Sequence, residues 1–185
     1  MFGDPMMLTP FWKWDNALPA SLLDVAMSDF CRLDFSDGLL HEARVAPDEV
    51  RKSKVAMLNP SYWLCGILFN YAVLANKSAG WGCEIDLPET IQVAVYERGG
   101  HYNWHADTNF LSNKPLARKL TSVCLLNDRG QFVGGDFEIE GYSEPIRLDA
   151  GSVIVFPSVL RHRVTPVEFG VRYSATCWAL GPKRW

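Results

Sequence analysis

Residues 96–109 read YERGGHYNWHADTN and contain the pair His105 and Asp107, from which the interpretation of the whole chain starts. The preceding run, 91–96, alternates and is rich in β-branched side chains, which predicts a strand. Two glycines interrupt that run, and a second extended segment follows to Asp107. Side chains at i and i+2 of an extended chain point to the same face. We therefore expect His105 and Asp107 to reach one ion together.

A second histidine, His162, stands far downstream, just after the apolar run 153–156 that predicts a buried strand. Imidazole and carboxylate ligands suit Fe(II), Mn(II) or Zn(II) better than a thiolate-preferring metal. Two histidines and one carboxylate on one face of an octahedral ion leave three adjacent positions open, as in non-haem Fe(II) oxygenases. A lone His-x-Asp is also common as a surface pair or a satisfied hydrogen bond, so His162 is essential to this hypothesis.

The last predicted strand, 171–178, carries an arginine within an apolar run. The period of two puts four of its side chains on one face: Arg172, Ser174, Thr176 and Trp178. An inward arginine is costly unless it is paired. A ligand carboxylate would pair it well, because the guanidinium offers two parallel donors to two oxygens. The alternative is a structural salt bridge from Arg172 to Asp149 or Glu168.

Four stretches carry a family resemblance, and the last is the most specific because it fixes many positions at set spacing. They are Tyr96-x-x-Gly99 before His105-x-Asp107, Thr121 with LLND at 125–128, GGDF at 134–137 with AGS at 150–152, and PSxxxHxVxPVxxGxR from 157 to 172. On these motifs the chain resembles Fe(II)- and 2-oxoglutarate-dependent dioxygenases of the prolyl 4-hydroxylase-like group, and most closely the PKHD-type hydroxylases. The resemblance spans most of the chain and is strongest from 92 to 178.

The resemblance implies a site and a set of cofactors. It implies His105, Asp107 and His162 as iron ligands and Arg172 as the partner of the distal carboxylate of 2-oxoglutarate. Further residues implied at the site are Tyr96 and Thr176 beside the co-substrate and Trp178 near the iron. Fe(II), 2-oxoglutarate and dioxygen are the implied cofactors, and ascorbate is left open as a further reductant.

One position departs from the family pattern. Many relatives place a tyrosine on the strand after the His-x-Asp, where it helps to hold the distal carboxylate. Counting from Thr121 and Asn127, the matching position is Cys124, a poor hydrogen-bond donor. We expect 2-oxoglutarate to be held more by Arg172 or by another hydroxyl.

The order of elements predicts a mostly β chain of the α+β type. Helices are expected at 18–32 and 59–76, and short strands from there to the end. This order suggests a double-stranded β-helix, a jelly-roll core with the N-terminal helices packed on one sheet. The length of 185 residues suits one domain, 1–185, with a helical support region at 1–88 and a jelly-roll catalytic core at 89–182.

Two local expectations can be checked against the structure. The second helix is predicted to face inward through four residues: Trp63, Ile67, Tyr71 and Leu74. Strands are expected at 39–45 and 54–58, around a loop.

Composition excludes several classes of function. Apolar content of 48% and charged content of 21% are those of a soluble globular protein. The net charge of −3 does not favour nucleic acid or an anionic membrane as partner. The basic run RKSK at 51–54 is interpreted as a solvated surface. We expect no signal peptide, because the N-terminal residues lack a basic region before an apolar core, and no apolar run approaches the ~20 residues needed to span a bilayer.

The cysteines indicate a reducing compartment. Cys31, Cys65, Cys83, Cys124 and Cys177 are odd in number and form no Cys-x-x-Cys pair. This favours reduced thiols in a cytoplasmic setting, most of them buried as small apolar residues.

The favoured hypothesis is that the protein is an oxygenase that hydroxylates an unactivated C–H bond. A prolyl residue of a peptide or protein is the favoured substrate. The alternatives are an oxygenase acting on a small molecule and a non-catalytic, cupin-like domain that holds a metal or a 2-oxo acid. His101 precedes His105 by four residues, a spacing that on a helix would suit zinc. The glycines before it oppose a helix, so His101 is not expected to be a ligand.

Overall fold

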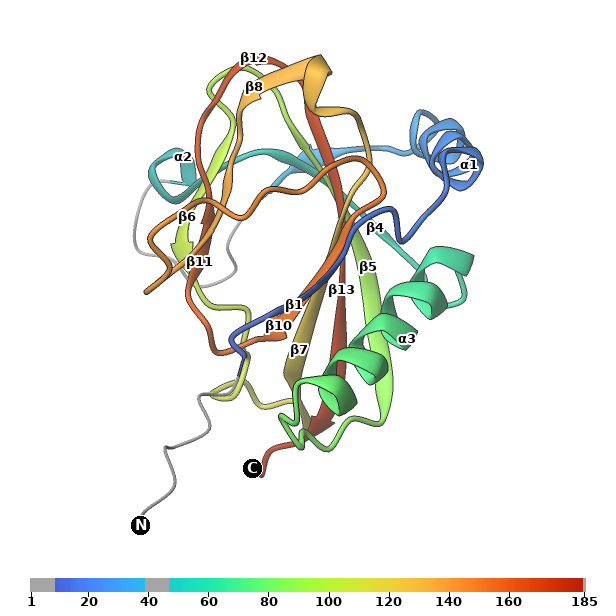
Figure 1. The fold of residues 1–185 in the computed structure, drawn as a ribbon, viewed down its shortest axis with the longest axis vertical. Helices are drawn as coiled ribbons and strands as arrows, with labels where there is room; N and C mark the ends of the chain where they lie inside the picture. The colour runs from blue at the N-terminus through green and yellow to red at the C-terminus, as the bar shows by residue number, and fades with distance from the viewer. Residues whose placement is uncertain (1–8, 39–46, 185) are drawn as a thin grey trace.

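The structure, a computed structural model, describes residues 9–38 and 47–184 and is built mainly from strands (Figure 1). Its described helices are α1 (Ala20–Phe30), α2 (Pro47–Val50) and α3 (Trp63–Ser78), with a 3-10 turn at Arg129–Gln131. The strands are β1 (Trp12–Trp14), β2 (Ser36–Asp37), β3 (Arg51–Lys52), β4 (Lys54–Leu58), β5 (Leu87–Tyr96), β6 (His101–His105), β7 (Leu116–Leu125), β8 (Phe132–Gly134), β9 (Phe137–Ile139), β10 (Val153–Pro157), β11 (His162–Val164), β12 (Val167–Gly170) and β13 (Arg172–Pro182).

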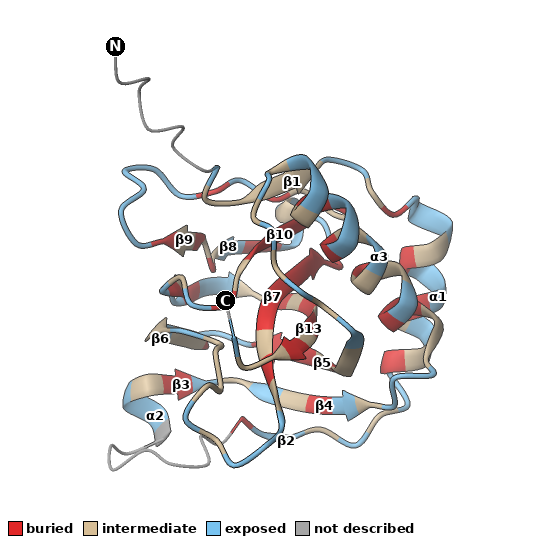
Figure 2. Ribbon diagram, turned by 90° about the horizontal axis from the view of Figure 1, so that it is seen from below, coloured by how far each residue is buried: buried red, intermediate tan, exposed pale blue. Residues whose placement is uncertain are grey.

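The larger sheet has seven strands in the order β1-β10-β7-β13-β5-β4-β2. Its central strand, β13, pairs antiparallel with β7 on one side and with β5 on the other. These three long strands hold much of the buried surface, as Figure 2 shows. Both faces of these strands are largely buried because each face is covered, one by helices α1 and α3 and the other by the second sheet.

The smaller sheet, β3-β6-β11-β9, lies across from the larger one (Figure 1). A hydrophobic cluster fills part of the space between them, with Val123 and Leu125 from β7 and Ile139 and Val164 from β9 and β11. A two-stranded pair, β12-β8, closes one end. Two facing antiparallel sheets form a jelly roll, so the predicted fold class is confirmed.

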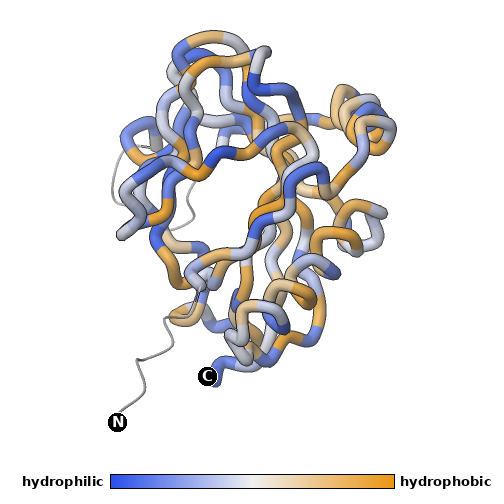
Figure 3. Tube along the Cα trace, viewed as in Figure 1, coloured by the Kyte–Doolittle hydropathy of each residue, from blue (hydrophilic) through white to orange (hydrophobic). Residues whose placement is uncertain are grey.

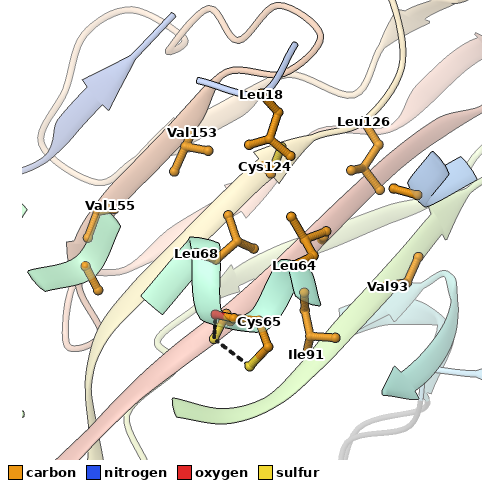
Figure 4. Close-up of a cluster of buried hydrophobic side chains, with 14 of the residues drawn as sticks. Leu18, Leu64, Cys65, Leu68, Ile91, Val93, Cys124, Leu126, Val153 and Val155 are labelled. Carbon is orange, nitrogen blue, oxygen red and sulfur yellow. Dashed lines mark hydrogen bonds between the residues drawn. The ribbon is translucent and has the colours of Figure 1, made fainter. Parts of the chain in front are cut away.

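Helices α1 and α3 cover the outer face of the larger sheet, as predicted, whereas α2 lies against β3 and β6 of the smaller sheet. Leu64 and Leu68 of α3 pack with Val153 and Cys124 of the sheet (Figure 4). Hydrophobic and hydrophilic residues are interspersed along the chain (Figure 3).

The inward face of α3 differs from the prediction by about one residue. Its fully buried side chains are Leu64, Cys65, Leu68, Ala72 and Ala75. Trp63, Ile67 and Tyr71 are only partly buried at the margin of the cluster, and Leu74 is 42% exposed. The small side chains of Cys65, Ala72 and Ala75 allow α3 to approach the sheet closely. The prediction missed this face because it looked for large apolar side chains.

Among the remaining expectations, the strand at 54–58 is confirmed as β4. The strand expected at 39–45 lies outside the described residues. No helix in the described ranges has the length and apolar character that a membrane span requires.

Gly170 ends β12, two residues before β13 begins, and has a left-handed φ of +75°. A Cβ at this position would lie 1.9 Å from the carbonyl oxygen of Gln131. Neither the conformation nor the space admits a side chain without movement of the backbone.

We predict that Gly170→Ala lowers the free energy of unfolding by about 2–4 kcal/mol, as strain and collision add together. Gly141→Ala is the matched control, because Gly141 has a φ of +86° with nothing near its missing Cβ. It should lose only about 1 kcal/mol. Urea unfolding of both variants measures the difference, and equal losses would show that the collision with Gln131 does not matter.

Candidate active site

Three side chains at the ends of two strands of the smaller sheet converge at one point. His105 ends β6, Asp107 follows two residues later, and His162 begins β11. His105 and His162 are direct partners in the antiparallel β6–β11 pairing. The Nε2 atom of His105 lies 3.6 Å from Oδ1 of Asp107, and the Nε2 atom of His162 lies 3.6 Å from Oδ2. One potential ligand atom from each residue lies within 4.8 Å of the other two.

Backbone carbonyls fix which ring nitrogen of each histidine is free. Nδ1 of His105 lies 2.7 Å from the carbonyl oxygen of Asn103, and Nδ1 of His162 lies 3.0 Å from that of Leu160. A carbonyl only accepts, so Nδ1 must carry the proton and donate it. Both Nε2 lone pairs are then free on the side where Asp107 lies, which is the state that binds a metal.

Burial keeps the site ready for a cation. It lowers the pKa of His105 to about 4, and the nearby charge of His162 acts in the same direction. The His105 imidazole is therefore neutral at neutral pH. Burial alone would raise the pKa of Asp107, but His162 and His105 outweigh it, and the pKa lies below its ordinary value. Asp107 is thus an anion that lies between the rings of His105 and His162.

Aromatic rings fix the orientation of both imidazoles. The ring of Tyr102 stacks on His105 with 3.4 Å between centroids and 11° between planes. The ring of Phe156 of β10 contacts that of His162 nearly edge-on, with 4.7 Å between the ring centroids. Burial holds the pKa of Tyr102 well above its usual range, so its phenol keeps its proton. These contacts limit rotation of the rings away from Asp107.

Arg172 begins β13 and is buried, with 2% of its surface exposed. Its Nη1 donates to the hydroxyl of Ser174 over 3.0 Å, and its guanidinium lies 5.4 Å from the ring centroid of Tyr96. Within the described ranges no carboxylate forms a salt bridge with it. The predicted alternatives do not serve, since Asp149 pairs with Arg147 and Glu168 is exposed. A buried guanidinium in this state calls for an anionic ligand.

All the predicted site residues line one cavity of about 490 Å³. They are His105, Asp107, His162, Arg172, Tyr96, Thr176 and Trp178. Tyr96 is the direct strand partner of Arg172 across β5 and β13. The period of two along β13 also holds, because Arg172, Ser174, Thr176 and Trp178 all face this cavity. His101 does not belong to the three-residue cluster.

The expectation for Cys124 is wrong. Cys124 points away from the cavity and packs against the helices in the cluster with Leu68 and Val153. Burial raises the pKa of its thiol to about 12. Its neighbours Val123 and Leu125 face the opposite cluster, between the sheets. Successive residues of a strand face opposite sides, so the position found by counting from Thr121 and Asn127 lies on the helix side of β7.

Sequence reasoning also missed Arg51, which was expected on a solvated surface. Arg51 is 6% exposed and lines the cavity, whereas Lys52 and Lys54 of the same run are exposed. Its Nε donates to Ser53 over 2.7 Å, and its guanidinium lies 4.5 Å from the ring centroid of Tyr102. Nη2 is buried without a hydrogen-bond partner in the described part of the chain. No signal in the run RKSK distinguishes Arg51 from its basic neighbours.

A second missed residue, Arg118 on β7, lies against Trp178. Its guanidinium is 3.5 Å from the ring centroid of Trp178, and its Nε donates to Glu89 over 2.6 Å. Glu89 also pairs with Lys114 at 3.1 Å. Arg118 therefore forms one charged wall of the cavity and fixes the indole beside Asp107.

Comparisons with known proteins point to one family. Residues 91–180 match the family described as the 2OG-Fe(II) oxygenase superfamily. A PKHD-type hydroxylase of Acidovorax ebreus (strain TPSY) is 32% identical over 153 residues, which is 78% of this chain and 66% of that protein. One of Teredinibacter turnerae is 32% identical over 100 residues, 50% of this chain and 44% of that protein. The chain thus spans less than two thirds of the length of these relatives.

Solved structures share the fold. The viral collagen prolyl hydroxylase vCPH of Paramecium Bursaria Chlorella virus-1, in its 2OG complex, superposes with a TM-score of 0.70 at 20% identity, over 94% of this chain and 97% of that one. A prolyl-4-hydroxylase of Pseudomonas putida gives 0.69 at 20% identity, over 95% and 94%. The convergence of His105, Asp107 and His162 in a jelly roll agrees with these matches, and the chain belongs to the 2OG-Fe(II) oxygenase superfamily.

Proposed function

We propose that this protein is an Fe(II)- and 2-oxoglutarate-dependent dioxygenase that hydroxylates an unactivated C–H bond, with a prolyl residue of a peptide or protein as substrate. The observation that carries the proposal is Arg172. It is a buried guanidinium with no carboxylate partner among the described residues, and it lines the same cavity as the cluster of His105, Asp107 and His162. A metal site alone has no use for such an arginine, whereas a dicarboxylic acid bound to the metal does.

The residues present fit the metal. Two imidazoles with free Nε2 atoms and one carboxylate form a donor set for Fe(II) that leaves three positions open. His105, Asp107 and His162 would hold the ion. When bound, Fe(II) would supply the redox chemistry that activates dioxygen, with 2-oxoglutarate as the co-reductant.

The residues also fit the co-substrate. The metal would bind one end of a 2-oxo dicarboxylic acid, and Arg172 with Ser174 would hold its far carboxylate through paired hydrogen bonds. Tyr96, Thr176 and Trp178 would line the same ligand, because all three lie on the cavity wall. These side chains fix the orientation of the acid and exclude water from it, which brings the reactants together. No separate general base is required.

Substrate recognition is proposed from the outer part of the cavity. The unpartnered Nη2 of Arg51 would bind a carbonyl or carboxylate oxygen of the substrate. Support for a prolyl substrate comes from neighbours of similar fold, one of which is a Trichoplax adhaerens prolyl hydroxylase in complex with a hypoxia inducible factor peptide fragment (TM-score 0.66, 23% identity, 92% of this chain). A peptide or proteome screen for products that gain one oxygen atom tests this step.

We also propose that residues 89–182 form the catalytic core and residues 1–88 a supporting region within one domain. Every residue proposed to hold metal or co-substrate lies between Tyr96 and Trp178, which supports this division. Arg51 shows that the first half still contributes to the cavity wall. A cytoplasmic, reducing setting and a role for ascorbate stay predictions from the sequence.

Two alternatives remain open to the same experiments. A cupin-like domain would bind metal, with or without a 2-oxo acid, but would not turn over. An oxygenase acting on a small molecule would turn over but would leave peptides unmodified. Arg172 discriminates against a site for metal alone, and the screen for oxygenated peptides discriminates against the second alternative.

We predict that His105→Ala or Asp107→Ala lowers succinate formation from 2-oxoglutarate in the presence of Fe(II) by more than about 100-fold, because each removes a metal ligand. His101→Ala is the matched control, since it removes an imidazole from the same strand outside the cluster. It should retain activity near that of the wild type. Turnover that survives in the His105 variant would remove the assignment.

We predict that Arg172→Met weakens 2-oxoglutarate binding to the Mn(II)-loaded protein by about 30-fold or more, as truncation of a buried charge pair does. 2-Oxobutanoate is the control ligand, because it chelates metal but has no distal carboxylate, and its affinity should not change. Ligand-induced shifts of thermal unfolding measure both. The variant without ligand should be at least as stable as the wild type, since an unpaired buried charge is removed. Equal loss of both ligands would argue against the clamp.

A further inference from the structure

Two buried hydroxyls form a chain of hydrogen bonds that ends on Asp107. Thr121 of β7 donates its hydroxyl proton to Oδ2 of Asp107 over 2.9 Å. The hydroxyl of Ser158, in the turn after β10, lies 2.9 Å from that of Thr121. Both residues are fully buried, with no exposed surface. Neither was singled out by its chemistry in the sequence.

The direction of these hydrogen bonds is fixed by the number of protons. A carboxylate oxygen accepts hydrogen bonds, and Oδ2 of Asp107 accepts the one that Thr121 donates. A threonine hydroxyl has one proton, which Thr121 gives to Asp107. Ser158 must therefore donate to Thr121. The result is a one-way relay, Ser158 to Thr121 to Asp107, in which each bond strengthens the next.

Ser158 holds Asp107 through the main chain as well. Its carbonyl oxygen accepts the backbone N–H groups of Asp107 and Thr108, each over 3.0 Å. The backbone N–H of Ser158 donates in turn to the carbonyl of Lys119 on β7 over 2.9 Å. The carboxylate is thus fixed by its backbone and by one of its own two oxygens.

The two oxygens of Asp107 are differently placed with respect to the histidines. Oδ1 lies 3.6 Å from Nε2 of His105, and Oδ2 lies 3.6 Å from Nε2 of His162. A carboxylate in this position can offer a metal one oxygen or both. The hydroxyl of Thr121 occupies Oδ2 and leaves Oδ1 without a hydrogen bond from that relay.

We propose that the Ser158–Thr121 relay is a positioning device that makes Asp107 a one-oxygen ligand, through Oδ1. The inference rests on the proposed function, because only an oxygenase needs free coordination positions for a 2-oxo acid and dioxygen. Two imidazoles and one carboxylate oxygen leave three of six octahedral positions, enough for a 2-oxo acid and dioxygen. A carboxylate that bound through both oxygens would leave only two. Without Thr121, the bare Oδ2 would turn to the metal, since a buried anionic oxygen needs a partner.

The test compares Thr121→Val, which keeps the shape and removes the hydroxyl, with Thr121→Ser, which keeps the hydroxyl. Ser122→Ala is a second control, because it removes a neighbouring buried hydroxyl that has no partner in the described residues. Titrations of Mn(II), and then of 2-oxoglutarate and 2-oxobutanoate on the Mn(II)-loaded protein, give three affinities for each variant. None of them depends on turnover.

We expect Thr121→Val to bind Mn(II) within about threefold of the wild type but to bind both 2-oxo acids about tenfold more weakly or worse, the scale of one hydrogen bond to a charged group. Thr121→Ser and Ser122→Ala should match the wild type. Loss of both acids separates this effect from that of Arg172→Met, which should weaken 2-oxoglutarate alone. If Thr121→Val fails to fold, Ser158→Ala removes the first hydroxyl of the relay and should shift the acids in the same direction by a smaller factor.

Other outcomes would overturn the proposal. A parallel loss of Mn(II) affinity would mean that Thr121 aligns the ligand without limiting it to one oxygen. Unchanged affinities in Thr121→Val would leave the relay without a role at the metal. A wild-type protein that binds Mn(II) but neither 2-oxo acid would instead refute the proposed function, and the relay with it.

Discussion

The pairing of β6 with β11 is the constraint on which the site depends. These two short strands belong to the smaller sheet and place His105 directly opposite His162. Because the pairing is antiparallel, residues far apart along the chain become neighbours at a fixed distance. Asp107 lies just beyond the end of β6, where its backbone turns to the carbonyl of Ser158. A slip of one residue in this register would separate the two imidazoles and send one of them to the other face.

Near that pairing, the cavity wall carries buried positive charges that do not stabilise the protein when no ligand is bound. Arg172 and Arg51 are both buried at the cavity wall, and neither forms a salt bridge with a described carboxylate. Arg118 differs, because Glu89 neutralises it and the indole of Trp178 covers it. The desolvation of two unpaired guanidiniums costs stability in the free protein. That cost is offset only when ligands bring acceptors into the cavity, so the folded state is built for the complex.

The sequence was sufficient for features that depend on local spacing. His105 and Asp107 share a face because they are two apart on an extended chain, and the same rule placed Arg172 with Ser174, Thr176 and Trp178. It failed where the answer depended on register or on approach between elements. Cys124 was expected beside the co-substrate, but it packs on the helix side of β7. Arg51 lies beside two exposed lysines, and its burial comes from β3 pairing with β6, a contact that no local pattern encodes. Thr121 and Ser158 meet only because β7 and β10 are neighbours in the sheet.

Alternate residues of β13, in the larger sheet, face opposite sides. Even-numbered residues of β13 from Arg172 to Trp178 face the cavity, while Ala175, Cys177 and Ala179 face the helices. One face of the strand therefore carries the side chains of the proposed site, and the other carries side chains that only pack against the helices. Substitutions on the helix-facing side are limited only by packing and leave the side chains in the cavity unchanged. A single-residue insertion in β13 has a larger effect, because every residue on one side of the insertion would change faces. Where Arg172 lies on that side, its guanidinium would turn toward the helices.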